Sequence, residues 1–149
     1  MQYRTFGNTG IKLSALGFGA MRLPEVEING LKQIDEEKAI SAMRRAFELG
    51  VNYIDTAYLY HGGASEVVVG KAVKGRRDKI YLSSKSPGHL VKKPGDYRRI
   101  LEEQLTKLQE EYLDFYYFHG ISFQSFMEIF SLFRFFRPES QLAERSGTS

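Results

Sequence analysis

The chain has 149 residues, and its 42% hydrophobic and 13% aromatic content is sufficient for the core of one globular domain. Its 21 Lys+Arg and 18 Asp+Glu residues leave a net charge of only +3, which gives no support to nucleic-acid binding. It has no cysteine, which excludes disulfides, thiolate metal sites and a cysteine nucleophile, and it shows no secretory signal or membrane-spanning stretch. We therefore expect a cytoplasmic protein without a membrane partner.

The N-terminal residues predict a β-hairpin followed by a short buried strand. Aromatic and apolar residues flank the turn sequence at 7–10, which is typical of a hairpin. Residues 16–21 form an apolar run with two glycines, which indicates a strand where neighbouring backbone lies close.

Helical and strand patterns then alternate along the chain. Asp35 is a suitable N-cap, and apolar residues recur at helical spacing after it until Gly50. Ser65 is placed to cap a second helix that ends near Gly75. The predicted order is a strand at 16–21, a helix at 35–50, a strand at 51–56, a helix at 65–75, a strand at 80–84, a helix at 97–112 and a strand at 113–118.

Strict alternation of strands and helices indicates an α/β fold with a parallel sheet and right-handed crossovers. Both a doubly wound sheet and a (β/α)8 barrel satisfy this pattern, and periodicity does not choose between them. The first strand is not followed by a Gly-x-Gly-x-x-Gly turn, which speaks against a doubly wound nucleotide domain.

Polar residues stand where three of the predicted strands end. Counting by twos along each strand places Asp55, Lys85 and His119 on one face, and Tyr60 follows in the loop after Asp55. In a barrel that face points inward, and the groups converge at the carboxyl end of the strands, where barrel enzymes keep their catalytic residues. Together they could deliver a proton.

Each of these residues also has a structural interpretation. Asp55 and Lys85 could form a structural ion pair, Tyr60 could pack a loop, and His119 could be a hydrogen-bonded core histidine. A metal site of His61, His119 and Asp55 is poorly supported, because the chain has no histidine pair at i, i+4. His61 and His89 are expected to be exposed loop residues.

The motifs, taken together, resemble the aldo-keto reductase family over about residues 2–120. The resemblance rests on the run Gly50-Val51-Asn52-Tyr53-Ile54-Asp55-Thr56-Ala57 with Tyr60 after it, Ser65-Glu66 with Gly70, Lys85 at a strand end, and His119. Met21-Arg22-Leu23-Pro24 and Tyr60-His61-Gly62-Gly63 resemble a bacterial branch that often carries an iron–sulfur tail, and no such tail is present here.

The resemblance implies an NADPH-dependent oxidoreductase that reduces the carbonyl group of a small aldehyde or ketone to an alcohol. Tyr60 would be the general acid, Lys85 would favour release of its proton, Asp55 would hold Lys85, and His119 would orient the substrate carbonyl. The residues that would lie against the nicotinamide are Gly19, Ala20 and Met21, with Asp55 nearby.

The chain departs from the family in its extent. A complete barrel has eight strands in about 250 residues, whereas four strands are predicted here after the hairpin. We expect residues 1–120 to form the N-terminal half of a (β/α)8 TIM barrel, 121–136 to form an aromatic amphipathic helix, and 137–149 to be a disordered tail. The alternative to a reductase is a truncated, inactive half-barrel that binds weakly or self-associates through its open edges.

Overall fold

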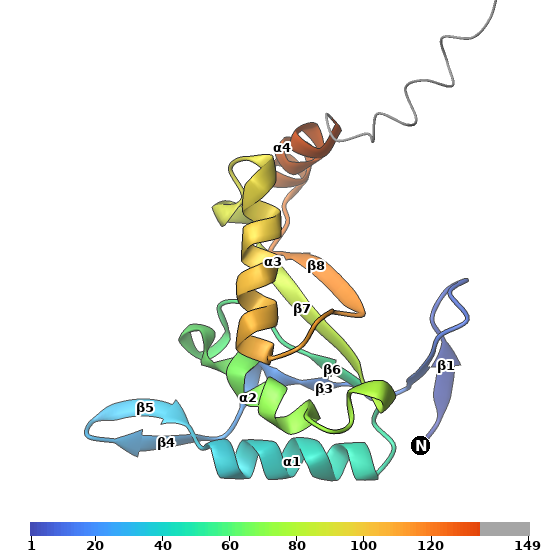
Figure 1. Ribbon diagram of the computed structural model, residues 1–149, viewed down its shortest axis with the longest axis vertical. Helices are drawn as coiled ribbons and strands as arrows, with labels where there is room; N and C mark the ends of the chain where they lie inside the picture. Colours follow the sequence, from blue (N-terminus) through green and yellow to red (C-terminus); the bar gives the residue numbers. More distant parts are fainter. Residues whose placement is uncertain (135–149) are drawn as a thin grey trace, which may run out of the picture.

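The computed structural model describes residues 1–134, and its centre is a four-stranded parallel sheet (Figure 1). The strands lie in the order β3-β6-β7-β8, the order in which they occur along the chain. Their bounds are Phe18–Gly19 for β3, Tyr53–Asp55 for β6, Tyr81–Pro87 for β7 and Phe115–His119 for β8. The predicted parallel sheet is confirmed.

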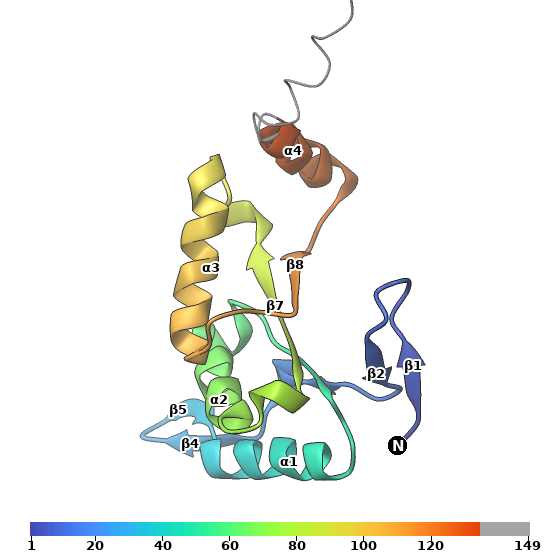
Figure 2. The ribbon, with the colours of Figure 1, turned by 45° about the vertical axis from the view of Figure 1, so that its right-hand side comes forward.

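Three helices cover one face of this sheet (Figures 1 and 2). They are α1 at Glu36–Glu48, α2 at Ala64–Val73 and α3 at Pro94–Leu108. The core lies between these helices and the sheet, and its fully buried members include Met43 of α1, Val69 of α2 and Leu82 of β7. Burial of this apolar surface, rather than helix propensity, holds the helices in place.

The helix ends follow the predicted capping signals in one case and not in the other. The Asp35 side chain accepts a hydrogen bond of 3.1 Å from the Lys38 amide, as an N-cap does. The expected cap of α2 was wrong, because the helix begins at Ala64 and its N-cap is Gly63. Ser65 is instead fully buried inside the first turn, where its hydroxyl donates to the Ala20 carbonyl at 3.0 Å.

Helices α2 and α3 pack at close range because Gly70 has no side chain. A Cβ atom placed on Gly70 would lie 2.1 Å from the Leu108 carbonyl oxygen. No larger residue fits this crossing without movement of a helix.

The opposite face of the sheet carries aromatic side chains and the N-terminal hairpin. Strands β1 (Tyr3–Thr5) and β2 (Lys12–Ser14) are antiparallel, which confirms the predicted hairpin. The ring centroids of Phe6 and Phe115 lie 4.9 Å apart, and Phe115 also contacts Tyr53. The hairpin therefore covers the amino-terminal part of this face.

A second hairpin, β4 (Glu25–Ile28) with β5 (Leu31–Ile34), projects beside α1 and was not predicted (Figure 1). Its turn residues Asn29 and Gly30 both have positive φ, 53° and 77°. Asn-Gly between short strands is a strong hairpin signal, so the sequence did contain the information.

The last described helix is α4, Phe123–Arg134, beyond the carboxyl end of β8 (Figure 1). Ile129 is buried, and its Cδ1 atom lies 3.4 Å from the Cβ position of Gly88. Phe123, Phe126 and Phe130 are exposed. Residues 135 and 136 of the expected aromatic helix, and the whole expected tail at 137–149, lie outside the described residues. No helix within 1–134 is both long and apolar enough to cross a membrane.

Candidate active site

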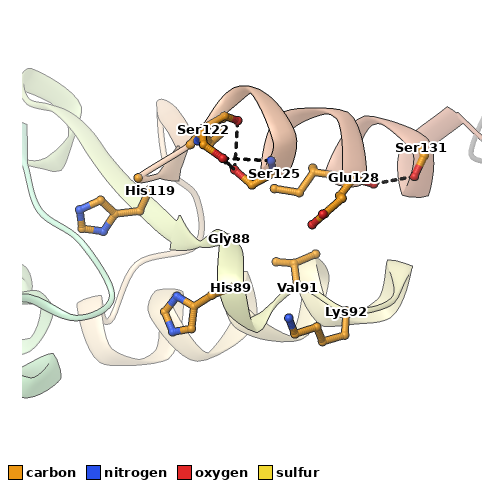
Figure 3. A pocket seen from close by; sticks show the side chains of 12 residues that line it. Gly88, His89, Val91, Lys92, His119, Ser122, Ser125, Glu128 and Ser131 are labelled. Atoms are coloured by element: carbon orange, nitrogen blue, oxygen red, sulfur yellow. Dashed lines mark hydrogen bonds between the residues drawn. The ribbon is translucent and has the colours of Figure 1, made fainter.

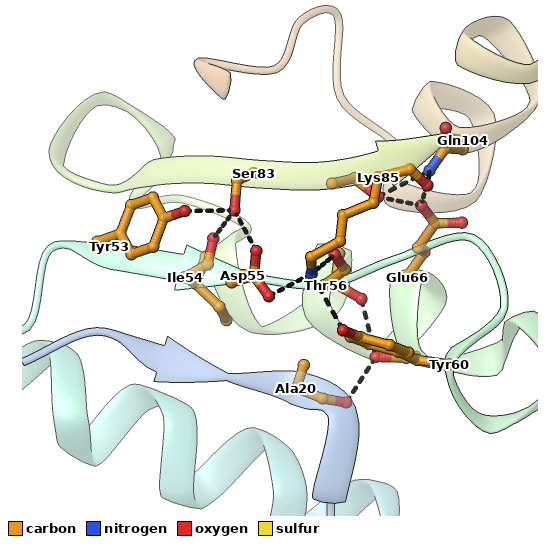
Figure 4. Close-up of polar contacts among 12 residues, drawn as sticks. Ala20, Tyr53, Ile54, Asp55, Thr56, Tyr60, Glu66, Ser83, Lys85 and Gln104 are labelled. Atoms are coloured by element: carbon orange, nitrogen blue, oxygen red, sulfur yellow. Dashed lines mark hydrogen bonds and ion pairs between the residues drawn. The ribbon is translucent and has the colours of Figure 1, made fainter. Parts of the chain in front are cut away.

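The carboxyl ends of the parallel strands bring together the residues that the sequence singles out, and Figure 4 shows Asp55, Tyr60 and Lys85 among them. Asp55 is the last residue of β6, Lys85 lies in β7, and His119 ends β8. Tyr60 begins the short 3-10 helix η2, Tyr60–Gly63, which follows the loop after β6. The predicted convergence of these four residues is present in the structure.

The Lys85 ammonium is the centre of the site. Its Nζ donates to Asp55 Oδ2 at 2.5 Å, to the Thr56 carbonyl at 2.8 Å and to the Tyr60 hydroxyl at 3.1 Å. An ammonium has three N–H donors and no acceptor, so these three contacts use its full hydrogen-bonding capacity. The Tyr60 oxygen is therefore an acceptor toward Lys85, and the proton of Tyr60 is left for another partner.

The Asp55 carboxylate is held from a second side by residues that sequence reasoning missed. Ser83 Oγ donates to Asp55 Oδ1 at 2.9 Å, and the Tyr53 hydroxyl donates to Ser83 Oγ at 2.9 Å. Burial raises the pKa of Tyr53, so this phenol remains a neutral donor. The alternation of side chains along β6 and β7 places Tyr53 and Ser83 on the face of Asp55 and Lys85, and this signal could have found them.

His119 completes the group from the far edge of the sheet. Its ring is perpendicular to that of Tyr60, with centroids 5.5 Å apart and an interplanar angle of 87°. Both residues are partly exposed.

The three residues expected against a cofactor lie at the carboxyl end of β3 and directly after it, beside Asp55. Gly19 ends β3 and is paired in register with Asp55. Ala20 is buried, whereas Met21 is 54% exposed. No atom lies within 4 Å of a Cβ position at Gly19, so the backbone here is open to a bound group.

His61 is not the exposed loop residue that we expected. Its Nε2 accepts from the Leu23 amide at 3.2 Å, and its Nδ1 lies 3.2 Å from Glu25 Oε1. One neutral tautomer, with the proton on Nδ1, satisfies both contacts. His89 is exposed as expected. In residues 1–134, no group of three or more His, Cys, Asp or Glu side chains is arranged to hold a metal ion.

A pocket of about 550 Å³ opens beside His119, between the 3-10 helix η4 (Gly88–Leu90) and the start of α4 (Figure 3). Sequence reasoning did not predict it. Its walls include the polar side chains of His89, Lys92, Ser122, Ser125 and Glu128. This pocket adjoins the candidate site through His119, which is one of its lining residues.

The comparison with protein families agrees with this geometry. The model of the aldo/keto reductase family matches residues 15–134. The chain belongs to this family of oxidoreductases, and its sheet and helices are part of a (β/α)8 barrel. The match extends through α4, whereas the motifs quoted from the sequence end at His119.

Individual relatives place the chain within that family. It is 36% identical over 140 residues to L-galactose dehydrogenase of Arabidopsis thaliana, covering 88% of this chain and 42% of that protein. It is 34% identical over 128 residues to the aldo-keto reductase YhdN of Bacillus subtilis, covering 80% of this chain and 38% of that protein. The chain thus spans less than half the length of these relatives.

Two solved structures share its fold. The holo form of aldo-keto reductase AKR11C1 from Bacillus halodurans matches with a TM-score of 0.70 and 32% identity, over 88% of this chain and 47% of that one. An aldo-keto reductase from Klebsiella pneumoniae in complex with NADPH matches with a TM-score of 0.65 and 30% identity, over 82% of this chain and 42% of that one.

Proposed function

We propose that this chain carries the proton-donating site of an NADPH-dependent reductase that converts an aldehyde or ketone to an alcohol. The observation that supports this most strongly is the contact of Lys85 Nζ with both Asp55 and the Tyr60 hydroxyl, at 2.5 and 3.1 Å. A structural ion pair alone does not require a tyrosine hydroxyl as the third partner of the ammonium.

Tyr60 acts as the general acid in this proposal. Its proton passes to the oxygen of the substrate carbonyl, and the Lys85 ammonium stabilises the phenolate that remains. Asp55 holds the Lys85 side chain in place, and Ser83 in turn orients Asp55. The roles suggested by the family resemblance and the hydrogen bonds point in the same direction.

His119 positions the substrate. Its ring stands against Tyr60, so a donor nitrogen on this ring can bind the same carbonyl oxygen that Tyr60 protonates. Two donors at one oxygen favour the geometry in which the proton is transferred, and they stabilise negative charge that develops there.

NADPH is the cofactor that the site best accommodates. The relative from Klebsiella pneumoniae was solved with NADPH, and the open backbone at Gly19 next to Asp55 leaves room for a planar ring. When bound, NADPH would supply the hydride to the carbonyl carbon. Gly19, Ala20 and Met21 would hold its nicotinamide end.

The test is NADPH-dependent reduction of a panel of small carbonyl compounds. We expect Tyr60→Phe to lower kcat by about 10²- to 10⁴-fold, because the general acid is removed while the ring is kept. Tyr112→Phe is the matched control, since Tyr112 is exposed and lies away from the site. Turnover that survives Tyr60→Phe unchanged would contradict the assignment.

A second candidate function is self-association without catalysis. Within the described residues, β3 and β8 each pair with one neighbour, so each leaves one edge unpaired. Tyr117 of β8 is also exposed, and so is the aromatic face of α4, which consists of Phe123, Phe126 and Phe130. These surfaces favour association of the 149-residue chain with a second copy.

A further inference from the structure

A buried polar cluster lies on the helix side of β7, behind the candidate active site (Figure 4). Glu66 of α2, Ser84 of β7 and Gln104 of α3 are all 0% exposed. Glu66 Oε1 accepts from Ser84 Oγ at 2.6 Å and from Gln104 Nε2 at 2.5 Å. Buried polar groups are costly unless paired, so this cluster has one favoured arrangement.

The cluster contacts the backbone of Lys85 directly. Gln104 Nε2 lies 3.2 Å from the Lys85 carbonyl oxygen, and the Tyr58 amide donates to the same oxygen at 3.3 Å. The Tyr116 hydroxyl donates to Gln104 Oε1 at 2.6 Å, which fixes the amide with its nitrogen toward Lys85. One carbonyl thus joins α3, β7 and the loop that leads to Tyr60.

Helix α3 also holds that loop through the side chain of Tyr58. The Tyr58 hydroxyl donates to Glu103 Oε2 at 2.8 Å, and Lys107 Nζ lies 3.9 Å from the centroid of the Tyr58 ring. Lys107 Nζ is also 3.3 Å from Glu66 Oε2. The same helix therefore contacts both the strand that carries Lys85 and the loop that carries Tyr60.

Tyr60 needs such external support. It begins η2, in which His61 and Gly62 have positive φ of 50° and 64°, so no regular helix fixes its position. The contact between Lys85 Nζ and the Tyr60 hydroxyl nevertheless has to be kept near 3.1 Å for the ammonium to stabilise a phenolate.

We propose that Gln104 and Lys107 of α3 are positioning residues that set the distance between Lys85 and Tyr60 from the back of the sheet. Glu66 connects the two, because it accepts from both. This inference rests on the reductase roles proposed for Lys85 and Tyr60. None of the three residues needs to touch substrate.

The test compares Gln104→Met with Ile100→Ala. Methionine keeps the length of glutamine but cannot donate to the Lys85 carbonyl, whereas Ile100 is equally buried one turn earlier in α3 and is not part of the cluster. The first readout is the NMR nuclear Overhauser effect between the Lys85 side chain and the Tyr60 ring. The second is kcat and KM for NADPH in carbonyl reduction.

We expect Gln104→Met to weaken the Lys85–Tyr60 cross-peak and to lower kcat by about 10- to 100-fold, with KM for NADPH changed by less than about 2-fold. Ile100→Ala should lose thermal stability but keep the cross-peak and kcat. The proposal would be overturned if Gln104→Met kept the cross-peak and kcat of the parent chain, or if Ile100→Ala lost both to the same extent as Gln104→Met.

Two further arms keep the result decisive. Should Gln104→Met fail to fold, Lys107→Met takes its place, because the Lys107 side chain is 28% exposed and methionine keeps most of its aliphatic length. It should also weaken the cross-peak, and an unchanged cross-peak would overturn the proposal. Should the parent show no turnover, the reductase function fails, while the cross-peak still decides the positioning role.

Discussion

At the scale of single residues, the site is defined by how the hydrogen-bonding capacity of Lys85 is used. Its three donors meet a carboxylate, a backbone carbonyl and a phenol oxygen, which are acceptors supplied by the segment 55–60. A cation placed in this way can stabilise negative charge that develops on the phenol oxygen without binding substrate itself. The chemistry proposed for Tyr60 therefore depends on a neighbour 25 residues further along the chain.

Replacement of Lys85 tests this dependence. We expect Lys85→Met to reduce carbonyl turnover by about 10²-fold or more, because the phenolate of Tyr60 loses its stabilising charge. The measurement is kcat with circular dichroism as a check on the fold. Lys79→Met is the control, because Lys79 is an exposed lysine in the turn before β7. Equal activity of the two variants would contradict the role of Lys85.

The positions of Asp55 and Lys85 could be predicted from the sequence, because they follow from the alternation of side chains along each strand. Asp55 and Lys85 lie on the same side of adjacent parallel strands, so their convergence requires only the correct alternation. The support behind them could not be predicted in this way. Glu66 and Gln104 are 38 residues apart and meet only because α2 and α3 pack side by side.

At the scale of elements, the crossing of α2 and α3 depends on one residue without a side chain. We expect Gly70→Ala to lower the free energy of unfolding by about 1–3 kcal/mol, because the added methyl group would overlap the Leu108 carbonyl, 2.1 Å from the Cβ position. Urea unfolding followed by circular dichroism measures the change.

Gly95→Ala provides the matched control for that substitution. Gly95 lies in the first turn of α3, and no atom lies within 4 Å of its Cβ position. Alanine should therefore be neutral or stabilise the chain by up to about 1 kcal/mol. Equal destabilisation by both substitutions would show that the close helix crossing is not the cause.

The helices and strands themselves were predictable to different degrees. The periodicity and the Asp35 cap identify α1, because both signals are local. The N-terminus of α2 was misjudged at Ser65, because the Ser65 hydroxyl donates to the Ala20 carbonyl instead of capping the helix. The β4–β5 hairpin was missed although its Asn-Gly turn is visible in the sequence.

At the scale of the whole molecule, partly buried tyrosines link the fold to pH. Burial raises the pKa of Tyr53 and Tyr116, and it raises the pKa of Tyr97 to about 12. In the unfolded chain these phenols ionise near pH 10. Because the folded state holds their protons more tightly, their contribution to stability is complete below about pH 10 and is lost as the pH rises above it.

A spectrophotometric titration of tyrosinate checks this expectation. Tyr53, Tyr97 and Tyr116 should ionise at higher pH in the folded chain than in urea, where all nine tyrosines are exposed to solvent. The urea concentration at the midpoint of unfolding should decrease as the pH is raised from about 9 to about 11. A single step near pH 10 in a chain that remains folded would contradict the prediction.

The open edges of the sheet give a prediction about association. Because β3 and β8 each leave one edge unpaired among the described residues, and because the aromatic face of α4 is exposed, we expect the purified chain to self-associate at micromolar concentration. Sedimentation velocity measures the distribution of species. A stable monomer across that concentration range would contradict the second candidate function.

The most direct test of the reductase account is a titration of the purified 149-residue chain with NADPH, followed by cofactor fluorescence. Saturable binding that is weakened by Gly19→Val, which would fill the open backbone beside Asp55, is the predicted result. Absence of binding by a chain that circular dichroism shows to be folded would contradict it. In that case the arrangement of Asp55, Tyr60, Lys85 and His119 would reflect family ancestry rather than an activity of this chain.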